Sequence, residues 1–172
     1  MDLPEDLGGA FPLRGVQGPQ EAVLEACARR QWTLAVAESC TGGLLGARLT
    51  TVPGSSDCFA GGVIAYSDRI KVSMLDVPPG LLRVHGAVSD PVAAAMAEGI
   101  VRRAGAQCGI SITGVAGPSG GTAEKPVGTV WVAVALPSKT VSRRFHFSGG
   151  RGEIRDQAVR AAMDLFLEAV GP

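Results

Sequence analysis

Residues 33–50 read TLAVAESCTGGLLGARLT and join three local signals in one short stretch. The apolar run 33–37 is typical of a strand buried on both faces. The segment 38–43 is polar and rich in glycine, and residues 44–50 have the apolar spacing of a helix. A buried strand that turns directly into a helix indicates an α/β fold.

The rest of the chain repeats this alternation of short apolar runs and helical patterns. Ser67 and Asp68 are candidate caps of a short helix, Ser89 precedes a helix that starts with Pro91, and Gly105 is a natural end for it. We expect helices over 20–30, 68–74, 91–104 and 153–170, a turn at 77–80, strands over 60–66 and 108–113, and a hairpin of strands 128–136 and 140–147. This order predicts a three-layer α/β/α sandwich with a mixed, mostly parallel sheet.

The two ends of the domain differ in character. Glycine and proline interrupt residues 1–18, which have no periodicity and are predicted to be a flexible N-terminal arm; residues 19–171 are predicted to form one domain. The N-terminus carries acidic residues where a secretory signal would be basic, and the longest apolar run, 130–136, is too short to span a bilayer. We therefore expect a cytoplasmic protein without membrane contacts.

Composition excludes several classes of function. Lys and Arg number 16 and Asp and Glu also 16, so the 172-residue chain lacks the basic excess of a nucleic-acid binder, and no nucleic-acid partner is expected. Four widely spaced cysteines and two histidines do not form the closely paired ligands of a structural zinc site. We expect neither a metal nor a cofactor. The 24 glycines point to tight turns and backbone-lined sites.

Three polar segments follow predicted strands, at 38–43, 66–71 and 113–121. Ligands of such sheets bind beyond the carboxyl ends of the strands, so we interpret these segments as one site. In the first, Ser39 can project its hydroxyl, and the amides of the following residues can stabilise a phosphate or an oxyanion. The amides in question belong to Thr41, Gly42 and Gly43. The alternative is that Ser39 or Thr41 is simply a helix cap.

A serine nucleophile needs a base, and the chain offers few. Lys71 lies five residues after Tyr66, the single tyrosine. A lysine beside a serine can accept its proton if burial lowers the lysine pKa from roughly 10.4. A tyrosine hydroxyl in the same pocket can relay that proton. His85 and His146 are the other candidate bases, and Lys71 and Tyr66 taken singly are also explained as a solvated helix residue and a packing residue.

The glycine-rich segment and the last helix supply candidate substrate-binding groups. The amides around Thr113, Gly114, Ala116 and Gly117 can approach a ligand closely, unless this segment is only a connector. At the start of the last helix, Arg151 and Arg155 are placed to reach a phosphate, with a solvated helix face as the alternative.

Several ordered motifs resemble one family. These motifs are AESCTGG at 37–43, VIAYSDRIK at 63–71, HGAVS at 85–89, TGVAGP at 113–118 and KPVGT at 125–129. They resemble the CinA C-terminal domain family, which contains the nicotinamide-nucleotide amidases (NMN deamidases) of bacteria. The resemblance runs from about residue 20 to residue 170.

The resemblance implies an amidohydrolase of pyridine-nucleotide salvage and NAD metabolism. The substrate would be nicotinamide mononucleotide, and the products nicotinate mononucleotide and ammonia. The family's Ser–Tyr–Lys set falls on Ser39, Tyr66 and Lys71, and the family also implies a homodimer. Ser39 would attack, Lys71 would take its proton and Tyr66 would relay a proton to the departing ammonia. The alternative functions are a non-catalytic pyridine-nucleotide-binding module and an interaction module associated with competence or DNA damage.

Overall fold

A five-stranded sheet of order β2-β1-β3-β4-β5 runs through the middle of the protein. The computed structural model describes residues 18–171, so all but the last residue of the predicted N-terminal arm lies outside the described residues. The strands are β1 (Leu34–Glu38), β2 (Phe59–Ile64), β3 (Cys108–Gly114), β4 (Thr129–Leu136) and β5 (Lys139–His146). The helices are α1 (Pro19–Arg29), α2 (Leu44–Leu49), α3 (Asp68–Leu75), α4 (Pro79–His85), α5 (Asp90–Ala104) and α6 (Arg151–Val170), with a 3₁₀ turn η1 (Ser55–Asp57).

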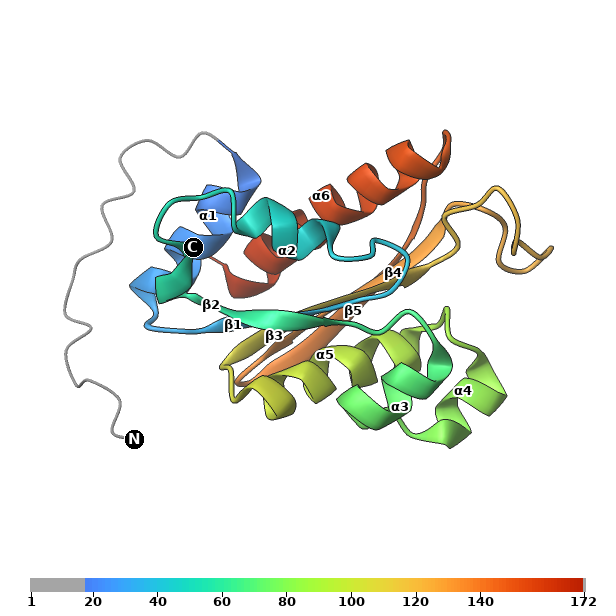
Figure 1. The fold of residues 1–172 in the computed structure, drawn as a ribbon, viewed down its shortest axis with the longest axis horizontal. Coiled ribbons are helices and arrows are strands. Elements are labelled where there is room, and N and C mark those ends of the chain that lie inside the picture. The colour runs from blue at the N-terminus through green and yellow to red at the C-terminus, as the bar shows by residue number, and fades with distance from the viewer. Residues whose placement is uncertain (1–17, 172) are drawn as a thin grey trace.

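The helices cover both faces of this sheet and complete the predicted α/β/α sandwich (Figure 1). On one face α6 packs on β3 and β4 and is joined by α1 and α2. On the other face α5 crosses the sheet, and α3 and α4 pack against it. Apolar side chains such as Leu24, Ile110 and Phe166 fill the first interface, and Ala35, Leu75 and Met96 help to fill the second.

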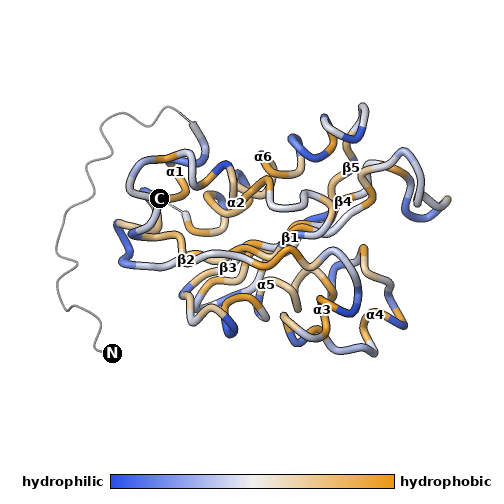
Figure 2. Tube along the Cα trace, in the orientation of Figure 1, coloured by the Kyte–Doolittle hydropathy of each residue, from blue (hydrophilic) through white to orange (hydrophobic). Residues whose placement is uncertain are grey.

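The sheet is mixed, as predicted. β1 pairs in parallel with β2 and with β3, whereas β3 with β4 and β4 with β5 are antiparallel. Because β5 reverses the direction of β4, it runs the same way as β3, and only β4 opposes the other strands. β1 lies between β2 and β3 and all of its residues are buried, which explains its continuous apolar run. Figure 2 shows the hydrophobic residues concentrated on the central strands.

Most element boundaries agree with the sequence to within one or two residues, and α4 is the exception. The segment that begins Val77-Pro-Pro-Gly was predicted to be a turn, but Pro79 occupies the first turn of a helix that ends at His85. Proline is well tolerated there because its missing N–H would have no helical partner. None of the α4 residues is fully buried, and only Leu81 and Leu82 pack partly buried against the core, so the helix is too short and too exposed to show a helical apolar pattern.

The register of the parallel strands positions the site. Glu38 at the end of β1 lies level with Ile64 of β2 and with Ile112 of β3. The residues that follow these three positions therefore leave the sheet at one common edge. Within the described residues, no helix has the length and apolar character needed to cross a bilayer.

Candidate active site

A cleft of about 360 Å³ opens at the carboxyl ends of β1, β2 and β3. It brings together all three predicted catalytic residues, Ser39, Tyr66 and Lys71. The other lining residues are Cys40, Asp68, Ala87, Val88, Thr113, Gly114, Val115, Ala116, Gly117, Ser119, Gly120 and Arg151. Of the predicted substrate-binding residues, Thr41, Gly42, Gly43 and Arg155 do not line it.

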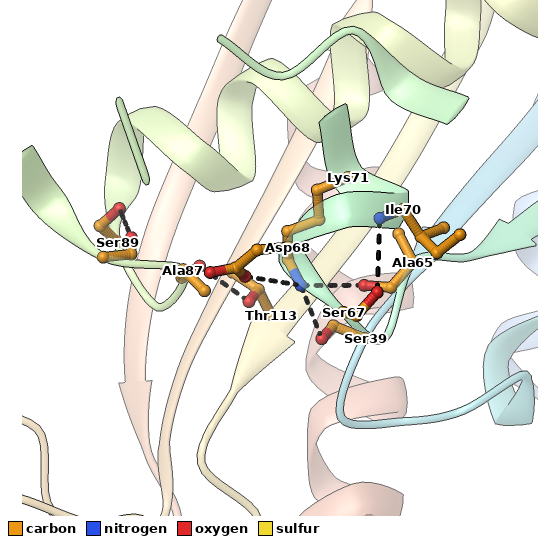
Figure 3. A network of polar contacts seen from close by, with 10 residues as sticks. Ser39, Ala65, Ser67, Asp68, Ile70, Lys71, Ala87, Ser89 and Thr113 are labelled. Carbon is orange, nitrogen blue, oxygen red and sulfur yellow. Dashed lines mark hydrogen bonds and ion pairs between the residues drawn. The ribbon is translucent and has the colours of Figure 1, made fainter. Parts of the chain in front are cut away.

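Ser39 and Lys71 are in direct contact at the buried floor of this cleft. The Lys71 Nζ donates to the Ser39 Oγ over 3.2 Å and to the Ala65 carbonyl over 2.9 Å. Asp68 Oδ1 lies on another side of the amine, at 3.9 Å (Figure 3). Ser67 caps α3 by accepting from the Ile70 amide, and this fixes the first turn of the helix that carries Lys71.

The surroundings of Lys71 favour its neutral form. Its side chain is only 1% exposed. Burial lowers the pKa of Lys71 because the ammonium loses its hydration, while the charges of Asp68 and Cys40 act in the opposite direction. A lowered pKa is what a lysine needs in order to accept a proton from serine.

Tyr66 lies at the rim of the cleft, away from the buried pair. It is 58% exposed, and its hydroxyl accepts from Arg151 Nη2 over 2.9 Å. The other end of the same guanidinium, Nη1, donates to the Gly117 carbonyl over 2.8 Å. Arg151 thus bridges the Tyr66 side of the cleft and the glycine-rich segment. Among the described residues, the Tyr66 hydroxyl makes no hydrogen bond with Ser39 or Lys71.

The turn after β1 differs from the predicted anion site. The Glu38 carboxylate, 1% exposed, accepts the amides of Gly43 (3.1 Å), Leu45 (3.1 Å) and Gly46 (2.9 Å). The Gly42 amide donates to the Ser39 carbonyl. The amides of Gly42 and Gly43 are therefore already paired, and the Glu38 side chain caps the start of α2. In this arrangement these two amides are not free to make the contact with an anion of the ligand that the sequence had predicted.

Thr41 and Arg155 pair with each other beside the cleft. Arg155 Nη2 donates to the Thr41 carbonyl over 2.7 Å, so this guanidinium braces the turn after Ser39. Thr41 itself is fully buried, and its hydroxyl has no hydrogen-bond partner among the described residues, so it is not the helix cap that the sequence left open. Gly42 and Gly43 adopt φ values of 58° and 94°, which glycine reaches at little cost and which this tight turn requires.

The glycine-rich segment forms the wall opposite Tyr66. The Thr113 hydroxyl donates to the Ala87 carbonyl over 2.9 Å, which ties the end of β3 to the chain before α5. Gly114 and Ala116 line the cleft beyond it. Gly117 has a φ of 78°, and a Cβ there would lie 2.5 Å from a methyl group of Val127, so only glycine fits.

The histidines are placed outside this site. Neither His85 nor His146 lines the cleft; His85 ends α4, and its carbonyl accepts from Lys125 Nζ over 2.6 Å. Within residues 18–171, no group of three or more His, Cys, Asp or Glu side chains is arranged to hold a metal ion. Lys71 is therefore the base that the geometry offers to Ser39.

Glu38, Cys40 and Asp68 lie within the polar segments predicted to form the site, but the sequence analysis assigned none of them a role in it. Asp68 was interpreted only as a helix cap, although it lies three residues before Lys71, the spacing that places two side chains on one helical face. The position of Glu38 at the end of a buried strand was a comparable signal, because a buried carboxylate must find donors. Cys40 carried no such signal.

Comparisons with known proteins agree with this architecture. The chain matches the family described as "CinA C-terminal domain" over residues 17–170. A CinA-like protein of Gemmatimonas aurantiaca is 56% identical over 147 residues, which are 86% of this chain and 34% of that protein. The chain thus spans about a third of the length of the curated relatives it matches.

Solved structures of similar proteins have the same fold. A competence-damaged protein (CinA) superfamily protein from Klebsiella pneumoniae superposes with a TM-score of 0.84 at 38% identity, over 90% of this chain and 98% of that one. A protein of the same superfamily from Escherichia coli gives a TM-score of 0.82 at 33% identity, over 94% and 95% of the two chains.

Proposed function

The chain belongs to the CinA C-terminal domain family, and we propose that it is an amidohydrolase that converts nicotinamide mononucleotide into nicotinate mononucleotide and ammonia. The observation that carries the reaction class is the buried contact between Ser39 Oγ and Lys71 Nζ. The choice of substrate rests on the resemblance of the motifs around Ser39, Tyr66 and Lys71 to those of bacterial nicotinamide-nucleotide amidases.

The three neighbours of the Lys71 amine match the needs of its neutral form. A neutral amine has two N–H bonds and one lone pair. Ala65 O accepts one hydrogen at 2.9 Å, and Asp68 Oδ1 at 3.9 Å lies beyond hydrogen-bond distance, so the lone pair can face the Ser39 hydroxyl. In this state the 3.2 Å contact reverses, and the serine O–H donates to the amine. The pair is then ready for proton transfer as serine attacks.

The reaction has two stages, acylation of Ser39 and hydrolysis of the acyl-enzyme. Ser39 Oγ forms a bond to the carboxamide carbon while its proton passes to Lys71, and the tetrahedral intermediate carries the negative charge on the former carbonyl oxygen. The C–N bond then breaks, and the lysine proton leaves with the nitrogen as ammonia. Water attacks the resulting ester while Lys71 accepts its proton, and the bond from the acyl carbon to Ser39 Oγ then breaks as Lys71 returns that proton to Oγ, which releases the acid.

The rim residues fit the part of the substrate that does not react. With the carboxamide at the buried floor, the ribose phosphate must extend toward the exposed side of the cleft. Arg151 lies there and is held by two neutral acceptors, the Tyr66 hydroxyl and the Gly117 carbonyl. A phosphate accepts from a guanidinium more strongly than these neutral groups do. Tyr66 is accordingly assigned first to positioning the nucleotide, with a proton relay through its hydroxyl as the expectation from the family.

The test is ammonia release from nicotinamide mononucleotide, its riboside and free nicotinamide. We expect Ser39→Ala and Lys71→Met to abolish release from the mononucleotide while the proteins stay folded. Ser73→Ala, on the exposed side of α3, is the matched control and should retain full activity. An active Ser39→Ala protein would contradict the serine mechanism. A wild-type protein that binds the nucleotide without releasing ammonia would instead support the non-catalytic alternative.

A further inference from the structure

The backbone amides between β1 and α2 are almost all paired. Amides that donate to backbone carbonyls belong to Ser39, Gly42 and Leu44, which bond Ile112, Ser39 and Thr41 respectively. Glu38 takes the amides of Gly43, Leu45 and Gly46. Within residues 18–171, only the amides of Cys40 and Thr41 in this turn donate to no other residue, and the Cys40 N–H lies near its own thiol.

These two unpaired amides differ in their access to the cleft. Cys40 lines it and directly follows Ser39, whereas Thr41 is fully buried and does not line it. In serine hydrolases whose nucleophile sits on a strand-to-helix turn, the amide after the nucleophile is an oxyanion donor. Cys40 stands at that position here.

We propose that the Cys40 amide stabilises the oxyanion formed when Ser39 attacks, and that Glu38 is the positioning residue that holds the turn in the shape that presents this amide. This inference rests on the serine mechanism proposed above. The Cys40 N–H is thereby assigned to the binding of the reacting oxygen, and Glu38 acts only through the position of that N–H.

The contacts of Glu38 explain how it positions the turn. α2 has only six residues and no other side-chain cap, so among the described side chains only this carboxylate holds amides at its start, while the Leu44 amide donates to the Thr41 carbonyl. Hydrogen bonds to a charged acceptor are the stronger kind, and three of them here tie the far end of the turn back to the end of β1. The residues between, including Ser39 and Cys40, are thereby fixed from both sides.

The same charge has a second consequence at Cys40. Burial, aided by the negative charge of Glu38, raises the pKa of the Cys40 thiol to about 11. The thiol beside the nucleophile is therefore protonated at neutral pH. Since only a thiolate is a strong nucleophile, Cys40 does not compete with Ser39 for the substrate.

Glu38→Gln tests the positioning role. Glutamine has nearly the same shape, but its amide nitrogen must face at least one backbone N–H, so the turn loosens. We expect the kcat for nicotinamide mononucleotide to fall by about 10²-fold, as when one oxyanion donor is lost, with KM nearly unchanged. Ser111→Ala, which removes a buried hydroxyl that donates to the Ala93 carbonyl, is a control for lost stability and should retain kcat.

A second measurement uses the wild-type protein, in case Glu38→Gln does not fold. 3-Pyridylboronic acid should form a B–O bond to Ser39, and the resulting tetrahedral anion mimics the reaction intermediate. In a ¹⁵N-resolved NMR spectrum we expect the Cys40 amide to move downfield on binding, and the Gly42 and Gly43 amides to move little. A shift confined to Gly43 with none at Cys40 would overturn the assignment.

Failure of the inference and failure of the proposed function have different signatures. Acylation of Ser39 by 4-nitrophenyl acetate needs the same oxyanion donor whatever the natural substrate is. Glu38→Gln should slow this acylation in the same proportion as kcat. If the wild-type protein is acylated but releases no ammonia, the proposed substrate is wrong and the inference stands. If folded Glu38→Gln is acylated at the wild-type rate, the role of Glu38 is refuted.

Discussion

Replacing Asp68 by Asn is predicted to move the activity of the protein toward more acidic pH. Asp68 Oδ1 lies 3.9 Å from Lys71 Nζ, and its negative charge stabilises the protonated lysine. Asparagine keeps the shape of the side chain but removes the charge. The protonated form of Lys71 then loses the one carboxylate that forms an ion pair with it among the described residues, and the pKa of Lys71 falls further.

The distance sets the size of this effect. Asp68 is 62% exposed, so the interaction is screened nearly as in water, where two unit charges 3.9 Å apart interact by about 1 kcal/mol. Since one pKa unit corresponds to about 1.4 kcal/mol, the expected decrease is about 0.8 pKa unit. The other titratable group that acts on Lys71 is the Cys40 thiol, which is protonated at neutral pH and does not add to the change.

The assay is the pH dependence of kcat/KM for ammonia release. Only unprotonated Lys71 can accept the Ser39 proton, so the acidic limb of the profile reports the pKa of Lys71. In Asp68→Asn this limb should lie about 0.8 pH unit lower than in the wild-type protein, and high salt should shrink the difference. Asp164→Asn, which loses an exposed ion pair with Arg160, should leave the limb in place. An unchanged limb, or one displaced to higher pH, would refute Lys71 as the base.

Two further predictions concern the rim and the cost of burying Lys71. Arg151→Ala should raise the KM for nicotinamide mononucleotide more than the KM for the riboside, because Arg151 lines the cleft. Arg155 does not line it, so Arg155→Ala should change the two KM values alike. If steady-state kinetics show that Arg151→Ala raises both KM values equally, Arg151 does not bind the phosphate. Lys71→Met should be inactive yet raise the free energy of unfolding at neutral pH by about 1 kcal/mol, because folding of the wild-type protein must desolvate or deprotonate the amine. The wild-type protein should regain this stability as the pH rises from the lowered pKa of Lys71 in the folded protein toward the unfolded value of roughly 10.4. In denaturant titrations, the difference in the free energy of unfolding between Lys71→Met and the wild-type protein should therefore shrink over that pH range. A difference that does not depend on pH would contradict this account.

The sequence predicted the fold where the signal is local. β1 and α2 were recognised because a continuous apolar run, a glycine-rich turn and a helical pattern follow one another within residues 33–50. α4 was missed because it is short and none of its residues is fully buried; the adjacent Leu81 and Leu82 that pack against the core are too few to show a helical period. The mixed sheet followed from the alternation of strands and helices and from the final hairpin.

The site could be predicted as a group of residues but not as a geometry. Ser39 and Lys71 were expected in one pocket because parallel strands end at a common edge of the sheet. The choice between Arg151 and Arg155 could not be made, since they lie about one turn apart on the same helix and only packing decides which one faces the cleft. The bonds of Glu38 were equally hidden, because its acceptor atoms meet amides five to eight residues further along the chain.

The burial of Lys71 is an argument for function in its own right. Lys71 is among the largest side chains that are fully buried in the described part of the chain. Its amine nevertheless has only the Ala65 carbonyl and the Ser39 hydroxyl within hydrogen-bond distance. An ammonium has three hydrogens to place, and the third faces only the largely exposed Asp68 carboxylate at 3.9 Å, so the charged form is weakly satisfied; an apolar side chain of similar length would pack there without that cost. Folding alone therefore does not explain a lysine at this position. A catalytic role explains it, because Ser39 needs a base that accepts its proton. The burial that destabilises the ammonium also favours the neutral amine, which can act as that base.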